Sequence, residues 1–242
     1  MLVHSAEWTE ELKRPFNLST KAGYENLLRF CGYGVPNVEK LLWSASNSLT
    51  LIAQDSLQPF FKEKSAIKTR DINLHELPWP KDILEGLGDT KVEMKVTLSY
   101  FIEPNPGQRG WSTKYSYVSH RLQFDVRRPL ETVDQFKQRI NKKARDDEFD
   151  TKNNVKESGN WILGSKLRTR GSVHSDTWAG TAVELAARKD IAVFPLNGWW
   201  KELKQHERWG ESARYSLIVT IKTPETDIYT EVSNQVASIV EV

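Results

Sequence analysis

The feature that most constrains the fold is a long alternation of apolar and polar side chains over Lys91–Ile102. Because successive side chains of a β-strand point to opposite faces, this alternation predicts an antiparallel strand with one face in the core. A chain with such a strand needs a sheet that has one apolar and one polar face. The apolar positions are Val92, Met94, Val96, Leu98, Tyr100 and Ile102.

Other segments predict further strands. In Lys114–Arg127 the apolar phase changes, which indicates a bulge near Ser119–His120. Shorter apolar runs predict strands over Leu49–Gln54, Ile72–Leu77, Trp161–Leu163, Thr181–Ala187, Ile191–Phe194 and Arg214–Ile221. Many antiparallel strands joined by Pro- and Gly-containing turns are typical of sandwich folds. The predicted fold class is therefore mainly β: an antiparallel, jelly-roll-like β-sandwich preceded by a short helical segment, with one or two inserted helices.

The helical segment is expected to occupy residues 1–46, and the sandwich residues 47–242. Apolar residues recur at helical spacing between Thr20 and Gly32, and Asn37 can cap a second helix. In the sandwich, Thr132 and Gln135 predict a helix that begins with a capping box. The charged stretch near 142–158 is expected to be an exposed loop. The apolar stripe of the second helix is Val38, Leu41, Leu42 and Ala45.

Composition excludes several function classes. The 34 basic and 32 acidic residues leave a net charge of +2, which argues against a partner bound through bulk charge, such as nucleic acid. No apolar run is long enough for a membrane helix. The single cysteine, Cys31, excludes an internal disulfide framework and fits a reducing compartment, so a cytoplasmic location is slightly favoured. No metal site and no cofactor is predicted, because the five histidines are dispersed as His4, His75, His120, His174 and His206.

Several phrases carry a family resemblance. LVHSAEWT at residues 2–9, followed by GYGVPN at 32–37 and VEKLL, resembles the end of the catalytic domain of subtilisin-like serine proteases (subtilases), in order and spacing. HSDTW, GTAVELA and FPLNGWW resemble phrases of the C-terminal β-sandwich extensions of large bacterial subtilases. The resemblance implies that this chain is the C-terminal part of a larger serine endopeptidase.

The catalytic motifs of that family are absent from the 242 residues. Subtilases need an Asp in a DTG-like turn, a His in an HGT-like motif and the serine of a GTSxAxP motif. None of these motifs occurs here, so the resemblance places them upstream of Met1 and predicts an inactive piece. Calcium is possible in the parent protease, but nothing in this chain predicts a calcium site.

The same reading assigns an interface. Removal of the catalytic domain would uncover apolar side chains near the start of the chain, so residues 1–15 are expected to be frayed, repacked or covered by self-association. Burial of Leu2–Trp8 in a core made only by this chain would argue against the hypothesis. The residues predicted to face the upstream catalytic domain are Leu2, Val3, His4, Ala6, Trp8 and Tyr33.

Three clusters resemble sites but have simpler interpretations. Ser172, His174 and Asp176 contain triad residue types, yet three residues in line on one strand are not within hydrogen-bond reach of one another. Alternating Lys166, Arg168 and Arg170 are expected to lie on an exposed sheet face. The acidic run Asp146, Asp147, Glu148 and Asp150 is read as a solvated segment, since it lacks the spacing of a calcium loop.

Two alternatives to structural support stay open. The sandwich could be a recognition module that binds a protein or carbohydrate through an exposed aromatic surface formed by Trp199, Trp200 and Trp209. The chain could also be an enzyme in its own right, with a site that no motif reveals, such as a pair of carboxylates far apart in the sequence.

Overall fold

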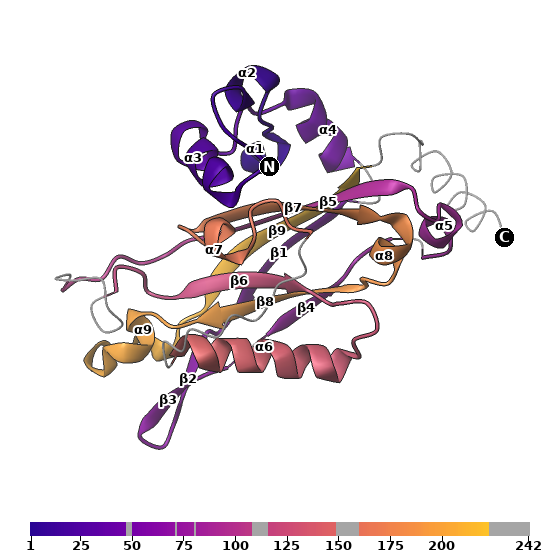
Figure 1. Cartoon of the computed structure of the whole chain (residues 1–242). Helices are drawn as coiled ribbons and strands as arrows, with labels where there is room; N and C mark the ends of the chain where they lie inside the picture. Colours follow the sequence, from indigo (N-terminus) through magenta and orange to yellow (C-terminus); the bar gives the residue numbers. More distant parts are fainter. Residues whose placement is uncertain (47–49, 71, 80, 108–115, 149–159, 223–242) are drawn as a thin grey trace.

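The computed structural model describes residues 1–46, 50–70, 72–79, 81–107, 116–148 and 160–222. Two antiparallel sheets face each other, four short helices lie outside one sheet, and a long helix lies outside the other (Figure 1). The first sheet has the order β1-β9-β5-β7 and the second the order β4-β8-β6. Pairing of early with late strands in both sheets is typical of jelly-roll sandwiches.

The first sheet is made of β1 (Leu51–Leu57), β9 (Ala213–Lys222), β5 (Lys91–Tyr100) and β7 (Val173–Thr181). The alternation predicted for β5 is confirmed, because its even-numbered side chains from Val92 to Tyr100 are all buried between the sheets. Residue Ile102 lies beyond the strand end and is only partly buried.

The second sheet consists of β4 (Asn73–Glu76), β8 (Asp190–Leu196) and β6 (Arg121–Val126). Its inner side chains meet those of the first sheet in one large core. Strand β8 is buried on both faces, because helix α6 (Val133–Glu148) covers the outside of this sheet. The outer contacts join Phe136 and Ile140 of α6 to Ala192, Phe194 and Leu196 of β8.

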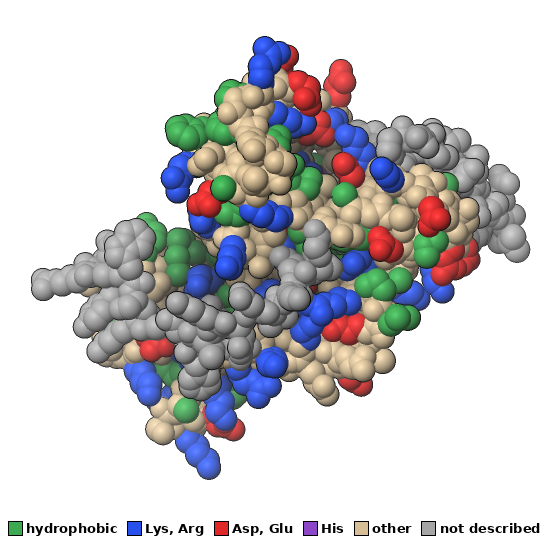
Figure 2. Space-filling model, viewed as in Figure 1, with side chains coloured by type: hydrophobic (Ala, Val, Ile, Leu, Met, Phe, Trp, Pro, Cys, Tyr) green, Lys and Arg blue, Asp and Glu red, His purple; other side chains and the backbone are tan. Residues whose placement is uncertain are grey.

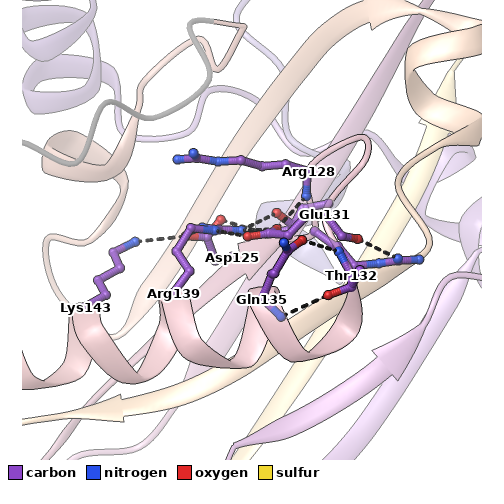
Figure 3. Close-up of polar contacts among 9 residues, drawn as sticks. Asp125, Arg128, Glu131, Thr132, Gln135, Arg139 and Lys143 are labelled. Atoms are coloured by element: carbon purple, nitrogen blue, oxygen red, sulfur yellow. Dashed lines mark hydrogen bonds and ion pairs between the residues drawn. The ribbon is translucent and has the colours of Figure 1, made fainter.

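Ion pairs fix α6 to the second sheet (Figure 3). The Arg139 guanidinium donates to Asp125 of β6 at 3.0 Å and to both carboxylate oxygens of Glu131 at 2.8 and 3.0 Å. Lys143, one turn further along, also donates to Asp125, at 3.2 Å. The predicted capping box is present, with Gln135 N donating to Thr132 Oγ1 and Thr132 N donating to Gln135 Oε1.

The four N-terminal helices form a unit that we call the helical lobe, residues 1–46. It contains α1 (Leu2–Ser5), α2 (Glu10–Lys13), α3 (Lys21–Cys31) and α4 (Val38–Ser46). The lobe lies against the outer face of the first sheet, opposite the second sheet (Figure 1). As predicted, Gly32 follows the end of α3, and Asn37 Oδ1 accepts from Lys40 N at the start of α4. The side chain of Thr20 caps the start of α3.

Small elements complete the fold. A hairpin of β2 (Phe60–Glu63) and β3 (Ala66–Thr69) packs against α9 (Trp199–Glu202) and the 3-10 turns η2 (Lys204–His206) and η3 (Arg208–Gly210). Helices α5 (Lys81–Gly86) and α8 (Ala182–Ala186) close the other end of the sandwich, and α7 (Ser165–Arg168) precedes β7. None of the helices in the described ranges is long and apolar enough to span a membrane.

The mainly β class is thus confirmed, with nine strands in three antiparallel sheets within the described residues. Several predicted boundaries were wrong. Thr181–Ala187 is not a strand: β7 ends at Thr181, and a capping box of Thr181 and Glu184 then begins α8. The charged stretch that was expected to be a loop from residue 142 is helical up to Glu148, because α6 continues through it. Residues 149–158 lie outside the described residues.

Three further strand predictions need correction. Within Lys114–Arg127 only Arg121–Val126 forms a strand, and residues 114 and 115 lie outside the described part of the chain. Before β6, Val118 makes only an isolated antiparallel bridge to Pro104, and the backbone carbonyl of Ser119 accepts from the N–H of Trp200. Trp161–Leu163 makes a single bridge to Trp178. The predicted strand from Leu49 begins at Leu51, since residue 49 is outside the described ranges.

Candidate functional site: the helical lobe and the buried polar clusters

The junction between the helical lobe and the sandwich is built around His4. Its Nδ1 lies 2.9 Å from Thr97 Oγ1 on β5, and its Nε2 lies 3.0 Å from Thr220 Oγ1 on β9. Thr97 Oγ1 in turn lies 2.8 Å from Ser175 Oγ on β7. Burial lowers the pKa of His4 to about 3, aided by the nearby charge of Lys95. The imidazole is therefore neutral, and it joins the lobe to three strands at once.

Further polar contacts hold the lobe to the sandwich. Lys95 of β5 donates to the carbonyl of Ala6 at 2.6 Å, and the Tyr33 hydroxyl donates to the carbonyl of Val173 at 2.7 Å. Lys21, at the start of α3, donates to the carbonyls of Trp161 and Ile162. These bonds connect residues 89 to 141 positions apart. The lobe is thus held on the sandwich by long-range hydrogen bonds.

The GYGVPN turn, residues 32–37, has a definite structural role. Glu7 and Val35 exchange backbone hydrogen bonds of 3.0 and 2.9 Å. Gly34, directly before Val35, has φ +92°, and a Cβ on Gly34 would lie 2.2 Å from the Glu7 carbonyl oxygen. Only glycine fits this close approach and this backbone conformation. The turn therefore fastens the segment after α1 to the segment before α4.

The helical lobe exposes several large apolar side chains. Val38 and Leu42, one turn apart on α4, are 67% and 62% exposed, and Phe30 at the end of α3 is 75% exposed. Leu2 and Val35 are also more than half exposed. Figure 2 shows hydrophobic side chains at the surface of the lobe, at the top of the view. We call these five residues the apolar face of the lobe.

The structure divides the predicted interface residues into two groups. Leu2 is 65% exposed, and Val3, Trp8 and Tyr33 are half-buried. The prediction needs correction for His4 and Ala6, which are buried. The polar side chains of β5 and β9 supply partners for His4 that a sequence pattern does not reveal. Trp8 donates its indole N–H to the carbonyl of Gly32.

The triad-like residues do not form a triad. Asp176 is buried on the core side of β7 and accepts from the backbone N–H groups of Leu163, Gly164 and Thr177 at 2.8–2.9 Å. Burial raises the pKa of Asp176, although the Arg168 guanidinium, 3.4 Å away, acts in the opposite direction. His174 donates to the carbonyl of Gly171 instead of contacting a carboxylate. This geometry supports the structural interpretation.

The expectation of an exposed basic row was wrong for Arg168. The segment Ser165–Arg168 is helical, and Arg168 is 1% exposed. Its Cζ lies 4.6 Å from the ring centroid of Phe124 and 4.7 Å from that of Trp161, with Asp176 at its end. Arg170 is exposed and pairs with Glu25 of α3 at 2.8 Å. Arg168 is thus a core residue, and Arg170 belongs to the junction with the lobe.

The expected aromatic surface needs a similar correction. Trp199 and Trp200 are 1% and 6% exposed, because they pack with Phe60 and Ile67 of the hairpin. Their indole N–H groups donate to the carbonyl and the carboxylate of Glu103. Trp209 alone is half-buried, with Lys62 Nζ 5.5 Å from its ring centroid. The three tryptophans therefore do not form an exposed groove.

Two clusters of polar side chains could not be predicted from the spacing of residues in the sequence. Tyr100 lies between His120 and His174, with ring centroids 5.8 and 5.5 Å away. Burial lowers the pKa of each histidine to about 4. Nε2 of His120 and Nδ1 of His174 have no hydrogen-bond partner among the described residues. The two histidines come from different sheets, and only folding brings them near one tyrosine.

The second such cluster joins the edges of the two sheets. The Tyr215 hydroxyl of β9 lies 2.7 Å from His75 Nε2 of β4 and accepts from Asn73 Nδ2 at 2.8 Å. Asn73 also donates to Asp55 of β1 at 3.1 Å. Burial raises the pKa of Tyr215 to about 12, which keeps the phenol protonated. The cluster connects strands of both sheets.

The acidic run cannot be placed in this geometry, because the side chains of 146–148 and the whole of residue 150 lie outside the described part. Among the described residues, no group of three or more His, Cys, Asp and Glu side chains is placed to hold a metal ion. Comparison of the chain with models of known protein families and with curated proteins finds no match.

Proposed function

We propose that this chain is the non-catalytic C-terminal region of a subtilisin-like serine endopeptidase and stabilises the catalytic domain of that enzyme. In this proposal the triad lies in the upstream catalytic domain, and the helical lobe connects that domain to the sandwich. The proposal rests first on the order of LVHSAEWT, GYGVPN and VEKLL in the lobe.

The observation that carries the proposal is that the lobe is held to the sandwich and still exposes large apolar side chains. His4, Lys21 and Tyr33 hold it to the sandwich. The exposed side chains are those of the apolar face, Leu2, Phe30, Val35, Val38 and Leu42. Covering an apolar side chain of this size contributes about 1.5–3 kcal/mol. A catalytic domain packed on this face would gain stability from the contact, and the rigid junction would transmit it to the sandwich.

Burial of His4 and Ala6 limits the proposal to the exposed side chains. These two side chains are used within the chain, so they are not available to the catalytic domain. Docking is assigned to the five residues of the apolar face alone. We expect the partner surface to consist of helices with apolar side chains, like the lobe itself.

The first test is the coding sequence on the 5′ side of the Met1 codon. The proposal expects a continuous reading frame that encodes a GTSxAxP motif within a few tens of codons. The 242-residue chain should neither cleave casein nor react with a serine-directed fluorophosphonate. Labelling of this chain by the phosphonate would show that it carries its own nucleophile and would refute the proposal, as would a stop codon directly upstream.

The second test uses the longer protein that such a frame would encode. The double variant Val38→Glu/Leu42→Glu places two charges on the apolar face. We expect its casein-cleaving activity to be lost at a lower temperature than in the natural protein. Val183→Glu is the matched control, because Val183 is 45% exposed on α8 of the sandwich. Equal heat inactivation of both variants would contradict docking through the lobe.

A further inference from the structure

Arg188 is a buried arginine whose Nε has no hydrogen-bond partner among the described residues. The side chain follows α8 and is 5% exposed. Its Nε is fully buried, and no hydrogen bond or ion pair joins the guanidinium to any described residue. Burying a charge without a partner costs several kcal/mol. Proteins therefore pair such arginines, as this chain does for Arg168 with Asp176.

The guanidinium is held in place by Trp178 of β7. Its Cζ lies 4.7 Å from the centroid of the Trp178 ring, and that ring is completely buried. The ring needs the bare backbone of Gly180, where a Cβ would lie 2.2 Å from the nearest ring atom. The indole Nε1 of Trp178 is a second buried donor without a partner in the described structure. Two N–H donors on neighbouring side chains thus have no acceptor within the described ranges.

The two carboxylates whose charges act on Arg188, those of Glu184 and Asp125, accept hydrogen bonds from other residues. Glu184, one turn earlier, accepts from Thr181 N in the capping box of α8. Asp125 accepts from Arg139 and Lys143 (Figure 3). Burial lowers the pKa of Arg188 despite the opposing effects of Glu184 and Asp125. Both acids favour the charged guanidinium, but neither forms a hydrogen bond or ion pair with it among the described residues.

We propose that Arg188 and Trp178 form a binding site for a small carboxylate anion. A carboxylate oxygen pair matches the planar fork of a guanidinium, and one negative charge balances the one unpaired positive charge. The Trp178 ring fixes the guanidinium plane, which reduces the entropy lost on binding. The low exposure of Arg188 requires a small ligand, for which acetate is the simplest probe.

The test follows the two donors directly by NMR. The ¹⁵N spectrum of the chain should contain the Arg188 Nε–H and Trp178 indole N–H signals, assigned from the variants Arg188→Lys and Trp178→Phe. Titration with sodium acetate should shift both signals along one saturating curve. Sodium chloride at equal ionic strength should leave them unchanged. The midpoint of thermal unfolding should rise with acetate over the same concentration range.

Variants separate this site from a general effect of anions. Arg188→Met should abolish the saturable shift of the Trp178 signal, and Arg188→Lys should weaken acetate binding at least tenfold because lysine lacks the fork. Arg214→Met, which removes a charge from an exposed position on β9, should bind acetate like the natural chain. If Arg188→Met does not fold, the lysine variant decides alone. No saturable shift, an unchanged affinity in Arg188→Lys, or phosphate binding at least as tight as acetate would overturn the proposal.

Discussion

His4 and Thr97 are joined by a hydrogen bond of 2.9 Å although 93 positions separate them in the sequence. The bond links the first helix of the lobe to the central strand β5, and Thr220 completes the site at the other ring nitrogen. Burial lowers the pKa of His4, with the charge of Lys95 acting in the same direction, so the imidazole is neutral in the folded chain. The stability of the junction therefore depends on pH.

The free energy of unfolding should fall as the pH falls from about 6.5 towards 4. The pKa of His4 is lowered to about 3 and that of His120 and His174 to about 4, so the folded state stays neutral while the unfolded state binds protons. Stability is complete above the unfolded pKa of ~6.5 and is lost below it, by ~1.4 kcal/mol per pH unit for each histidine. Urea unfolding at several pH values measures the slope.

The matched variants for this slope are His4→Asn and His206→Gln. Removing His4 should reduce the slope, whereas His206 lies exposed in the turn after α9, and its replacement should leave the slope unchanged. An unaltered slope in His4→Asn would show that His4 is not neutral in the folded chain.

Asp176→Asn should destabilise the sandwich strongly. The substitution removes the charge that faces Arg168 and one of its acceptors, and it leaves a buried guanidinium between Phe124 and Trp161. Breaking a buried ion pair costs about 3–5 kcal/mol. Glu63→Gln breaks the exposed pair with Lys68 and should cost less than ~1 kcal/mol. Equal urea midpoints for the two variants would refute this difference.

Phe136→Ala should loosen helix α6. Phe136 is fully buried against β8, and truncating a buried phenylalanine costs about 3–5 kcal/mol. Val133→Ala, at the exposed start of the same helix, should stay within ~0.5 kcal/mol of the natural chain. Chemical denaturation followed by circular dichroism measures both. A small effect of Phe136→Ala would mean that α6 contributes little to the core.

Leu130→Asn should raise the thermal midpoint. Leu130 has φ +66° in the turn before α6, and its side chain is fully exposed, so it has no packing to lose. A left-handed conformation costs a leucine roughly 1 kcal/mol, and asparagine tolerates it better. Differential scanning calorimetry should show the rise. A lower midpoint would reveal a contact of Leu130 that offsets the backbone strain.

The sequence alone determined the elements whose pattern is local. The alternation in β5 and the capping box of Thr132 and Gln135 were both predicted, because each depends only on neighbours along the chain. The capping box of Thr181 and Glu184 was equally readable and would have identified α8. The apolar phrases around it suggested a strand instead.

Tertiary structure decided what depends on distant partners. Helix α6 continues past residue 142, and ion pairs from its charged side chains to Asp125 fix it to the second sheet. Arg168 is buried because Asp176, Phe124 and Trp161 surround it.

The same holds for the sites. His4 is enclosed by hydroxyls of β5 and β9, and Arg188 meets Trp178 only after β7 and α8 have packed. A local pattern records which face of an element is apolar. It cannot record which distant side chains bury a charged group or form an ion pair with it. The environment made by those side chains sets both the pKa values and the candidate sites.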